Sequence, residues 1–301
     1  MSAQTLGCTS ASAMTAAHPL QAEKRLSRFE EELAGTPLWT IVWVLVATFL
    51  ALALMRALSS DPVLGRLTTA LVSTSAMLFW VFRVTPHQGY RLRELLGEPP
   101  RASDWVTLLG VVAANLGLGV ALVELGRITG VQLTAPVRWM MASSGVGAIL
   151  DVANLVVFGA LLAPVAEELV FRGVLFRKWR RTLGPVKGLL LSSALFGVIH
   201  GGTMLSVAVG GLSFALLYTS TRTIWAPIVA HILNNSFSVA SVLVSWSLGI
   251  RRFELNLTPA QVAVLLFASL AGLLAFGWRS ASTLSAPLPP LRTAVAVARS
   301  L

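Results

Sequence analysis

Residues 163–176 read APVAEELVFRGVLF, an apolar run that contains Glu167, Glu168 and Arg172. Three charged side chains in such a run are unusual against the background of the whole chain. Its 301 residues are only 12% charged and 55% hydrophobic, and the mean hydropathy is +0.75. This composition is far from that of a soluble globular protein and predicts a protein of the lipid bilayer.

Apolar stretches long enough to cross about 30 Å of hydrocarbon as helices recur along the chain. We expect eight such spans: Trp39–Met55, Leu67–Phe82, Trp105–Leu125, Ile149–Phe171, Val186–His200, Leu205–Thr219, Ile224–Trp246 and Val262–Trp278. Asp104 and Thr258 stand where helix N-caps belong. The alternation of an outer-membrane barrel is absent. The sequence therefore predicts an all-α, polytopic membrane protein with a bundle of about eight transmembrane helices.

The net charge of +10 does not indicate a nucleic-acid partner, because its placement follows the membrane. With a cytoplasmic N-terminus and eight spans, 16 of the 23 Lys and Arg residues fall on the cytoplasmic side and six on the other, with Arg172 inside a span. This positive-inside bias predicts a multi-pass protein of the bacterial inner (plasma) membrane, with both termini cytoplasmic. We expect a cytoplasmic segment at 1–35, a transmembrane domain at 36–279 and a cytoplasmic tail at 280–301.

Titratable side chains deep in the spans are expensive, so they usually face the bundle interior and serve a function. Arg172 follows Glu168 by four residues, which pairs the two on one helix face and leaves Glu167 about 100° away. His200 and His231 are the further titratable groups. Asn235 shares a face with His231 at i and i+4, whereas Asn234 is expected to turn away.

This combination favours a hydrolytic site over a purely structural ion pair. A shielded glutamate with a neighbouring histidine can deprotonate water, and a second histidine with an asparagine can donate to an oxyanion. No GxSxG serine motif is present. A proton-coupled transporter or a bacteriocin-immunity protein without peptidase activity stays open as an alternative.

The polar residues also form three motifs in order: EExxxR at 167–172, FxxxH at 196–200 and HxxxN at 231–235. Together they resemble the motifs of the CAAX prenyl protease and bacteriocin-processing family of intramembrane endopeptidases. The resemblance covers about residues 151–244, which would be the catalytic core. It implies an eight-helix, glutamate-dependent peptidase that cleaves a membrane-associated protein or peptide.

The resemblance also implies a role for each motif residue. Glu167 would be the general base, His200 its partner on the water, and His231 with Asn235 the oxyanion donors, while Glu168 and Arg172 would hold the geometry.

No cofactor is expected. Glu167, His200 and His231 could supply three zinc ligands with an open fourth position, so a zinc peptidase is the alternative, but HExxH is absent and the water mechanism needs no metal. The distance along the helices from Glu167 and His231 to the flanking basic residues predicts the depth of the active-site cavity. We expect this cavity near mid-membrane, reached from the cytoplasmic half.

Overall fold

A computed structural model describes residues 61–84, 96, 98–131, 144–200, 204–250 and 254–286, with isolated positions at 39, 40, 46, 50 and 53. Within these ranges every regular element is a helix, as the hydropathy pattern predicts. The elements are α3 Pro62–Val84, α5 Ala102–Thr129, α6 Gly145–Asn154, η3 Leu155–Leu162, α7 Ala163–Glu168, η4 Leu169–Phe176, α8 Arg177–Leu183, α9 Pro185–Val198, α10 Met204–Thr221, α11 Trp225–Ser247 and α12 Pro259–Leu284.

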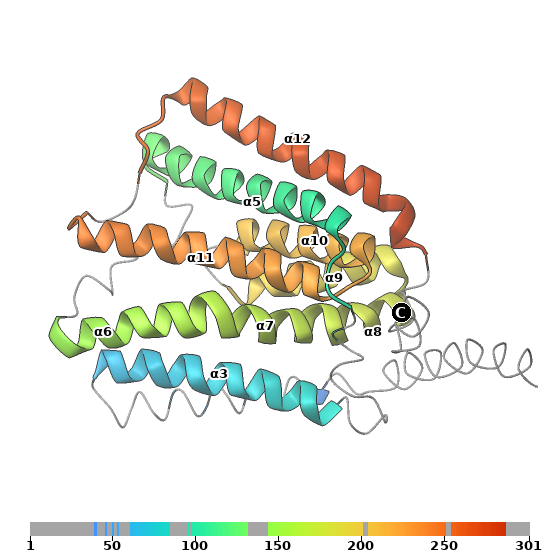
Figure 1. Ribbon diagram of the computed structural model, residues 1–301, viewed down its shortest axis with the longest axis horizontal. Coiled ribbons are helices and arrows are strands. Elements are labelled where there is room, and N and C mark those ends of the chain that lie inside the picture. The colour runs from blue at the N-terminus through green and yellow to red at the C-terminus, as the bar shows by residue number, and fades with distance from the viewer. Residues whose placement is uncertain are drawn as a thin grey trace, which may run out of the picture.

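The long helices lie side by side in one bundle (Figure 1). Helices α5 and α12 pack together on one side, α3 packs on α6 and α7 at the other, and α11 lies between them against α5 and η3. Helices α9 and α10 pack on each other and on η4. This arrangement surrounds the segment with the two glutamates by α3, α9, α10 and α11.

Five helical stretches of the described chain are long and apolar enough to cross a membrane: Pro62–Arg83, Ala102–Thr129, Gly145–Leu183, Trp225–Ser247 and Pro259–Leu284. Two further apolar helices, Pro185–Val198 and Leu205–Thr221, are shorter. Seven of the eight predicted spans thus coincide with helices. The span Trp39–Met55 and the segment 1–35 lie almost wholly outside the described residues, so eight spans are not confirmed. The protein is a multi-pass membrane protein, and the regular elements of its described part are all helices.

Helix ends follow local capping chemistry. Thr258 caps α12 as predicted: its hydroxyl accepts from Gln261 N at 3.3 Å, and Gln261 Oε1 accepts from Thr258 N at 2.9 Å. Asp104 is not the N-cap of α5, contrary to the prediction. The helix begins at Ala102, and Asp104 is its third residue, where Oδ2 accepts from Arg101 N at 2.8 Å. An acidic residue is favoured in either position, which is why the sequence does not separate them.

The helix from Gly145 to Leu183 is continuous but not uniform, because η3 and η4 are π-helical and flank the short α-helical turn of α7. Pro164 lies near the start of α7. A proline lacks the N–H that an α-helix needs at that point, and wide π turns of this kind are concentrated at functional sites. The helix around Pro164 thus has wide turns on both sides of the glutamates.

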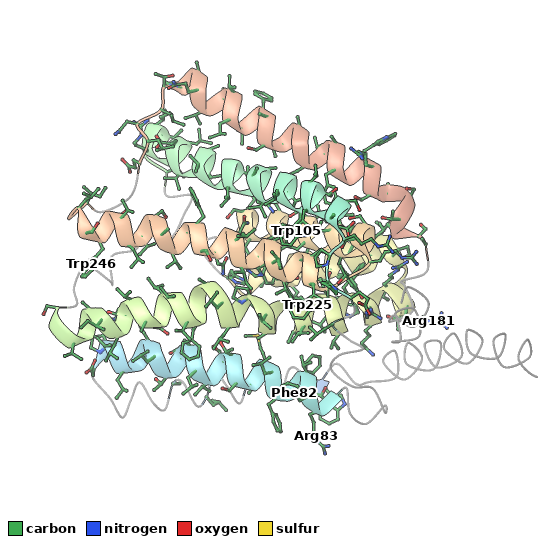
Figure 2. The ribbon with its side chains drawn as sticks, in the orientation of Figure 1. Phe82, Arg83, Trp105, Arg181, Trp225 and Trp246 are labelled. Atoms are coloured by element: carbon green, nitrogen blue, oxygen red, sulfur yellow. The ribbon has the colours of Figure 1, made fainter. Side chains whose placement is uncertain are left out.

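The bundle has two unlike halves. Basic residues gather at the end where α3, α8 and α10 finish: Arg83 and Arg181 lie there, whereas Trp246 lies at the opposite end (Figure 2). From the glutamates toward the basic end, all eight residues of η4 are buried, and the segment packs against α3, α9 and α10. The core therefore fills the part of the basic half that surrounds η4.

Candidate active site

Glu168 is a completely buried carboxylate that joins three helices. Its Oε1 accepts from Arg172 Nη1 at 2.8 Å and contacts His231 Nδ1 at 2.9 Å. Arg172 reaches further and donates from Nη2 to Gly211 O on α10 at 2.8 Å. A single hydrogen-bonded network therefore ties η4 to α10 and α11, and the predicted Glu168–Arg172 pair lies at its centre.

Aromatic rings enclose the buried guanidinium of Arg172. Its central carbon lies 4.7 Å from the ring centre of Phe196 and 5.7 Å from that of Phe214, within the range of cation–π attraction. Gly211 allows this approach, because a Cβ at that position would lie 3.0 Å from the Phe196 ring and 3.4 Å from Arg172 Nη2. The aromatic rings thus add to the stabilisation of the charge by Glu168.

Glu167 lies beside this network and belongs to it only loosely. Its carboxylate oxygens are 3.7 Å from His231 Nε2 and 3.9 Å from His200 Nε2. These separations are too long for direct hydrogen bonds but suit a bridging water. The Glu167 side chain is 13% exposed and that of Glu168 is fully buried. The two adjacent glutamates therefore have different environments, as the 100° rotation between them predicts.

The hydrogen bonds of the two histidines fix which ring nitrogen carries hydrogen. His200 Nδ1 lies 2.6 Å from the Phe196 carbonyl oxygen, which can only accept, so Nδ1 donates. His231 Nδ1 faces the Glu168 carboxylate in the same way. Both Nε2 atoms are left directed at Glu167. The FxxxH spacing explains the first contact, since residues i and i+4 stack on a helix, but the sequence did not show that the acceptor is the phenylalanine's backbone.

Asn235 is near His231, but its amide is already engaged. Its Nδ2 donates to Gly159 O in η3 at 2.9 Å, which leaves one N–H for another partner. Contrary to the prediction, Asn234 does not turn away from the site. It lines the same cavity as His231 and Asn235, and its Oδ1 is buried without a hydrogen-bond partner. Two neighbouring residues 100° apart can both border a wide cavity, which the spacing argument overlooked.

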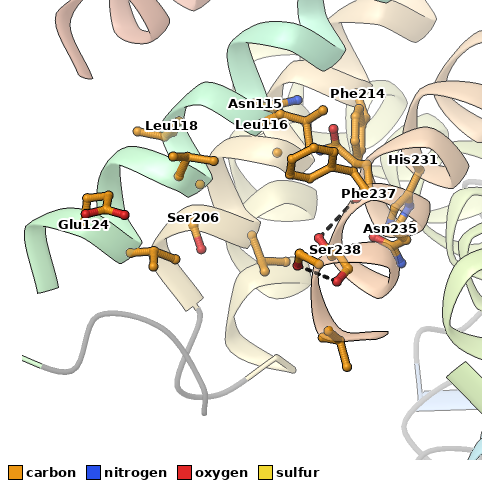
Figure 3. A pocket seen from close by; sticks show the side chains of 18 of the residues that line it. Asn115, Leu116, Leu118, Glu124, Ser206, Phe214, His231, Asn235, Phe237 and Ser238 are labelled. Atoms are coloured by element: carbon orange, nitrogen blue, oxygen red, sulfur yellow. Dashed lines mark hydrogen bonds between the residues drawn. The ribbon is translucent and has the colours of Figure 1, made fainter. Parts of the chain in front are cut away.

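That cavity has a volume of about 410 Å³ and lies between α5, α10 and α11 (Figure 3). His231 and Asn235 border one end, and Glu124 borders the other. The Glu124 carboxylate accepts from Leu255 N at 2.6 Å and from Arg127 Nε at 2.7 Å. This clamp holds the chain between α11 and α12 over the far end of the cavity.

A second cavity, of about 810 Å³, lies on the other side of the site between α3 and the long helix. Its lining residues include Asn154, Gly159, Ala163 and Glu167, which are four or five residues apart. An α-helix would rotate such a set away from one face within three turns. The π turns of η3 keep these residues on a single face, and so bring Glu167 to the cavity.

Both cavities extend from the site toward the end that is poor in basic residues. The sequence predicts access from the half with the basic residues, and these two cavities instead extend toward the opposite end of the bundle. The depth of Glu167 along the helix can be counted from the sequence. The side on which a cavity opens depends on packing, and on the basic side of Glu167 the helix is surrounded by packed residues, because all residues of η4 are buried.

The zinc alternative has mixed support from the donor set. Both imidazoles have the outer hydrogen bond on Nδ1 that metal-binding histidines usually have. The N–O separations of 3.7 and 3.9 Å exceed the edge of about 3.4 Å expected for a tetrahedron with ~2.1 Å bonds. Within the described ranges, no three His, Cys, Asp or Glu side chains converge closely enough to hold a metal ion.

Known proteins resemble the part of the chain that forms this site. Residues 150–237 match the family model described as Type II CAAX prenyl endopeptidase Rce1-like, nearly the stretch on which the three motifs lie. YdiL of Bacillus subtilis, named a membrane peptidase, is 33% identical over 103 residues, which are 32% of this chain and 42% of that protein. The chain thus matches less than half of that relative's length.

The membrane-embedded CAAX protease MroQ of Staphylococcus aureus is 25% identical over 224 residues, 68% of this chain and 89% of that protein. No solved structure matches the chain significantly. The names of these relatives support a membrane protease. Residues 150–237 therefore resemble the type II CAAX prenyl endopeptidase Rce1-like family.

Proposed function

We propose that the protein is an intramembrane endopeptidase that hydrolyses a peptide bond of a membrane-associated protein or peptide with water activated by Glu167. One observation carries the proposal. Two imidazoles, each with Nδ1 bound to an acceptor, direct Nε2 at one partly exposed carboxylate at distances that suit a bridging water. The site also borders a cavity on each side, so a substrate and a water can approach it.

Glu167 is the general base in this mechanism. A water hydrogen-bonded to Glu167 and His200 gives a proton to the carboxylate as its oxygen attacks the scissile carbonyl carbon. The carbonyl π bond opens and leaves an oxyanion. When the C–N bond breaks, protonated Glu167 returns the proton to the leaving amine, so the carboxylate is regenerated.

The oxyanion needs donors that the neutral histidines lack at Nε2. The remaining N–H of Asn235 is one donor. His231 becomes the second when Nε2 is protonated, since Glu168 accepts from Nδ1 and stabilises the imidazolium. The reactive state therefore carries one proton more than the state in which Glu167 is ionised and neither Nε2 atom is protonated. That extra proton is on His231 Nε2.

The test is to incubate purified wild-type protein with a library of membrane peptides and to identify products by mass spectrometry. Wild-type cleavage and at least ~100-fold slower cleavage by Glu167→Gln are expected, the usual scale of a general base. Equal rates for the two proteins would contradict the mechanism. A transporter would leave every peptide intact and move protons in sealed vesicles, and an immunity protein would protect cells even with Glu167 replaced.

A zinc-dependent peptidase is the second candidate, favoured by the hydrogen bonds on both Nδ1 atoms. Glu167, His200 and His231 would hold the ion, which would lower the pKa of a bound water and polarise the carbonyl. We favour the metal-free mechanism because the N–O separations exceed those expected around a tetrahedral zinc ion.

We also propose the orientation of the protein in the bacterial plasma membrane. Nine of the twelve described Lys and Arg residues lie at one end of the bundle: Arg83, Arg101, Arg177, Lys178, Arg180, Arg181, Lys187, Arg222 and Arg279. The positive-inside rule makes this end cytoplasmic. The two cavities then lie in the outer half of the membrane, and the substrate reaches the site from there.

A further inference from the structure

The cavity between α5, α10 and α11 has one polar wall, and this wall belongs to α11. After His231, the α11 residues that line it include Asn234, Ser238, Ser241 and Ser245. Their spacing of three or four residues places them along one helix face. The opposite walls, from α5 and α10, are mainly apolar, with Leu118, Val123, Val207 and Phe214 among them. The cavity is therefore amphipathic along its length.

The three serines of α11 lie in the cavity as hydrogen-bond acceptors. Each hydroxyl already donates to a carbonyl of its own helix: Ser238 to Asn234 O at 3.1 Å, Ser241 to Ser238 O at 2.7 Å, and Ser245 to Ser241 O at 2.8 Å. Each oxygen keeps lone pairs that can accept from a ligand. The buried, unpartnered Asn234 Oδ1 adds an acceptor at the end nearest His231.

An occupant that satisfies this wall must present N–H groups on one edge and apolar groups on the other. An extended apolar polypeptide does so, because the N–H groups on one edge repeat every two residues, or ~6.7 Å, about 1.3 Å more than the ~5.4 Å between helix turns. Asn234 and Ser245 are eleven positions apart, about 16 Å along α11. About five extended residues cover that distance.

We propose that this serine wall, Ser238, Ser241 and Ser245 of α11, holds the backbone of about five extended, apolar substrate residues that lie next to the scissile bond. The inference rests on the proposed function and adds the residues that set the register of the substrate. Leu255, held in place by Glu124, closes the far end and limits the length of the segment. The serines are positioning residues that contact amides remote from the reacting carbonyl.

The test measures binding with Glu167→Gln protein in detergent, so that no probe is cleaved. The probes are a fluorescein-labelled nonapeptide of alternating leucine and alanine and an analogue in which three amides on one edge are replaced by esters, which cannot donate. The second protein carries Ser238→Ala, Ser241→Ala and Ser245→Ala as well. The matched control is Ser247→Ala, whose hydroxyl donates to Val244 O on the same helix but is exposed and outside the cavity.

Each lost hydrogen bond is expected to weaken binding by about 2–10-fold. The ester probe should bind at least ~10-fold more weakly than the amide probe to the parent and to the Ser247→Ala protein. The two probes should bind the triple variant within about twofold of each other. The same amide-to-ester ratio in the parent and the triple variant would overturn the proposal, and so would no measurable binding of the amide probe, as expected for a cavity that holds only lipid chains.

The result of the probe-binding experiment does not depend on whether the wild-type protein cleaves the library peptides. Probe discrimination without cleavage by the wild type would reject the peptidase and retain the peptide site. Cleavage by the wild type without probe discrimination would reject the serine wall and retain the peptidase.

Discussion

Replacing each of the adjacent glutamates by glutamine should give two different defects. Glu168 has no exposed surface and is hydrogen-bonded to buried Arg172 and to His231. Glutamine keeps an acceptor oxygen but removes the charge, which leaves the guanidinium uncompensated. Removing one partner of a buried pair costs about 3–5 kcal/mol. At about 2–4 °C per kcal/mol, the melting temperature of Glu168→Gln should fall by ~10 °C.

Glu167→Gln should behave differently, because Glu167 has no ion-pair contact shorter than 3.7 Å and strands no buried partner. Its melting temperature should stay within about 2 °C of the wild type, while peptide cleavage falls at least ~100-fold. The assay is thermal unfolding of detergent-solubilised protein followed by tryptophan fluorescence, with cleavage measured on the same preparations.

A control for the Glu168 argument is Glu168→Gln combined with Arg172→Met, which removes both charges of the pair. Replacing a buried ion pair with apolar groups is often neutral, so the double variant should regain most of the lost melting temperature without regaining activity. Equal melting temperatures for Glu167→Gln and Glu168→Gln would refute the division of roles between the two carboxylates.

Three further outcomes follow from the structure. Chelator-treated enzyme should keep its activity and contain well under one zinc per chain; activity lost on chelation and restored by zinc would establish the metallopeptidase instead. Gly188→Ala should destabilise the protein by on the order of 3 kcal/mol in denaturant titrations, because its Cβ would lie 2.5 Å from Arg180 N, whereas Gly65→Ala has no atom within 4 Å and should be tolerated. Glu124→Leu should cost about 2–4 kcal/mol by leaving Arg127 Nε and two backbone N–H groups without their acceptor, and an unchanged melting temperature would contradict the clamp.

Sequence reasoning succeeded where one helix or one motif determines the answer. The helical class, seven of the predicted spans and the Glu168–Arg172 pair follow from hydropathy and from i,i+4 spacing. The proximity of Glu167, His200 and His231 was inferred from the cost of charge in lipid, and the structure brings the three together. Their catalytic roles stay predictions.

Contacts to the backbone and the location of the cavities could not be predicted in this way. The Phe196 and Gly159 carbonyls accept from site residues. Every residue has a backbone carbonyl, so the residue type does not indicate which carbonyl accepts. The predicted orientation of Asn234 was wrong because the angle between two residues on one helix does not give the width of the cavity beside that helix. The predicted side of access to the site differs from the side toward which the two cavities extend, because their position depends on how several helices pack.

The π turns of η3 also make the site sensitive to changes in chain length. In this segment the length of the helix and the rotation of its faces are separate quantities, because a wide turn takes up about one residue more than an α-helical turn. Deleting one residue between Leu155 and Leu162 would shorten the helix by only ~1.5 Å but would turn Glu167 by about 100° relative to α6. The carboxylate would then point away from both histidines, although every motif residue was still present. Relatives with intact motifs but a different number of residues in this segment should therefore be compared by helix rotation before they are assumed to have the same active site.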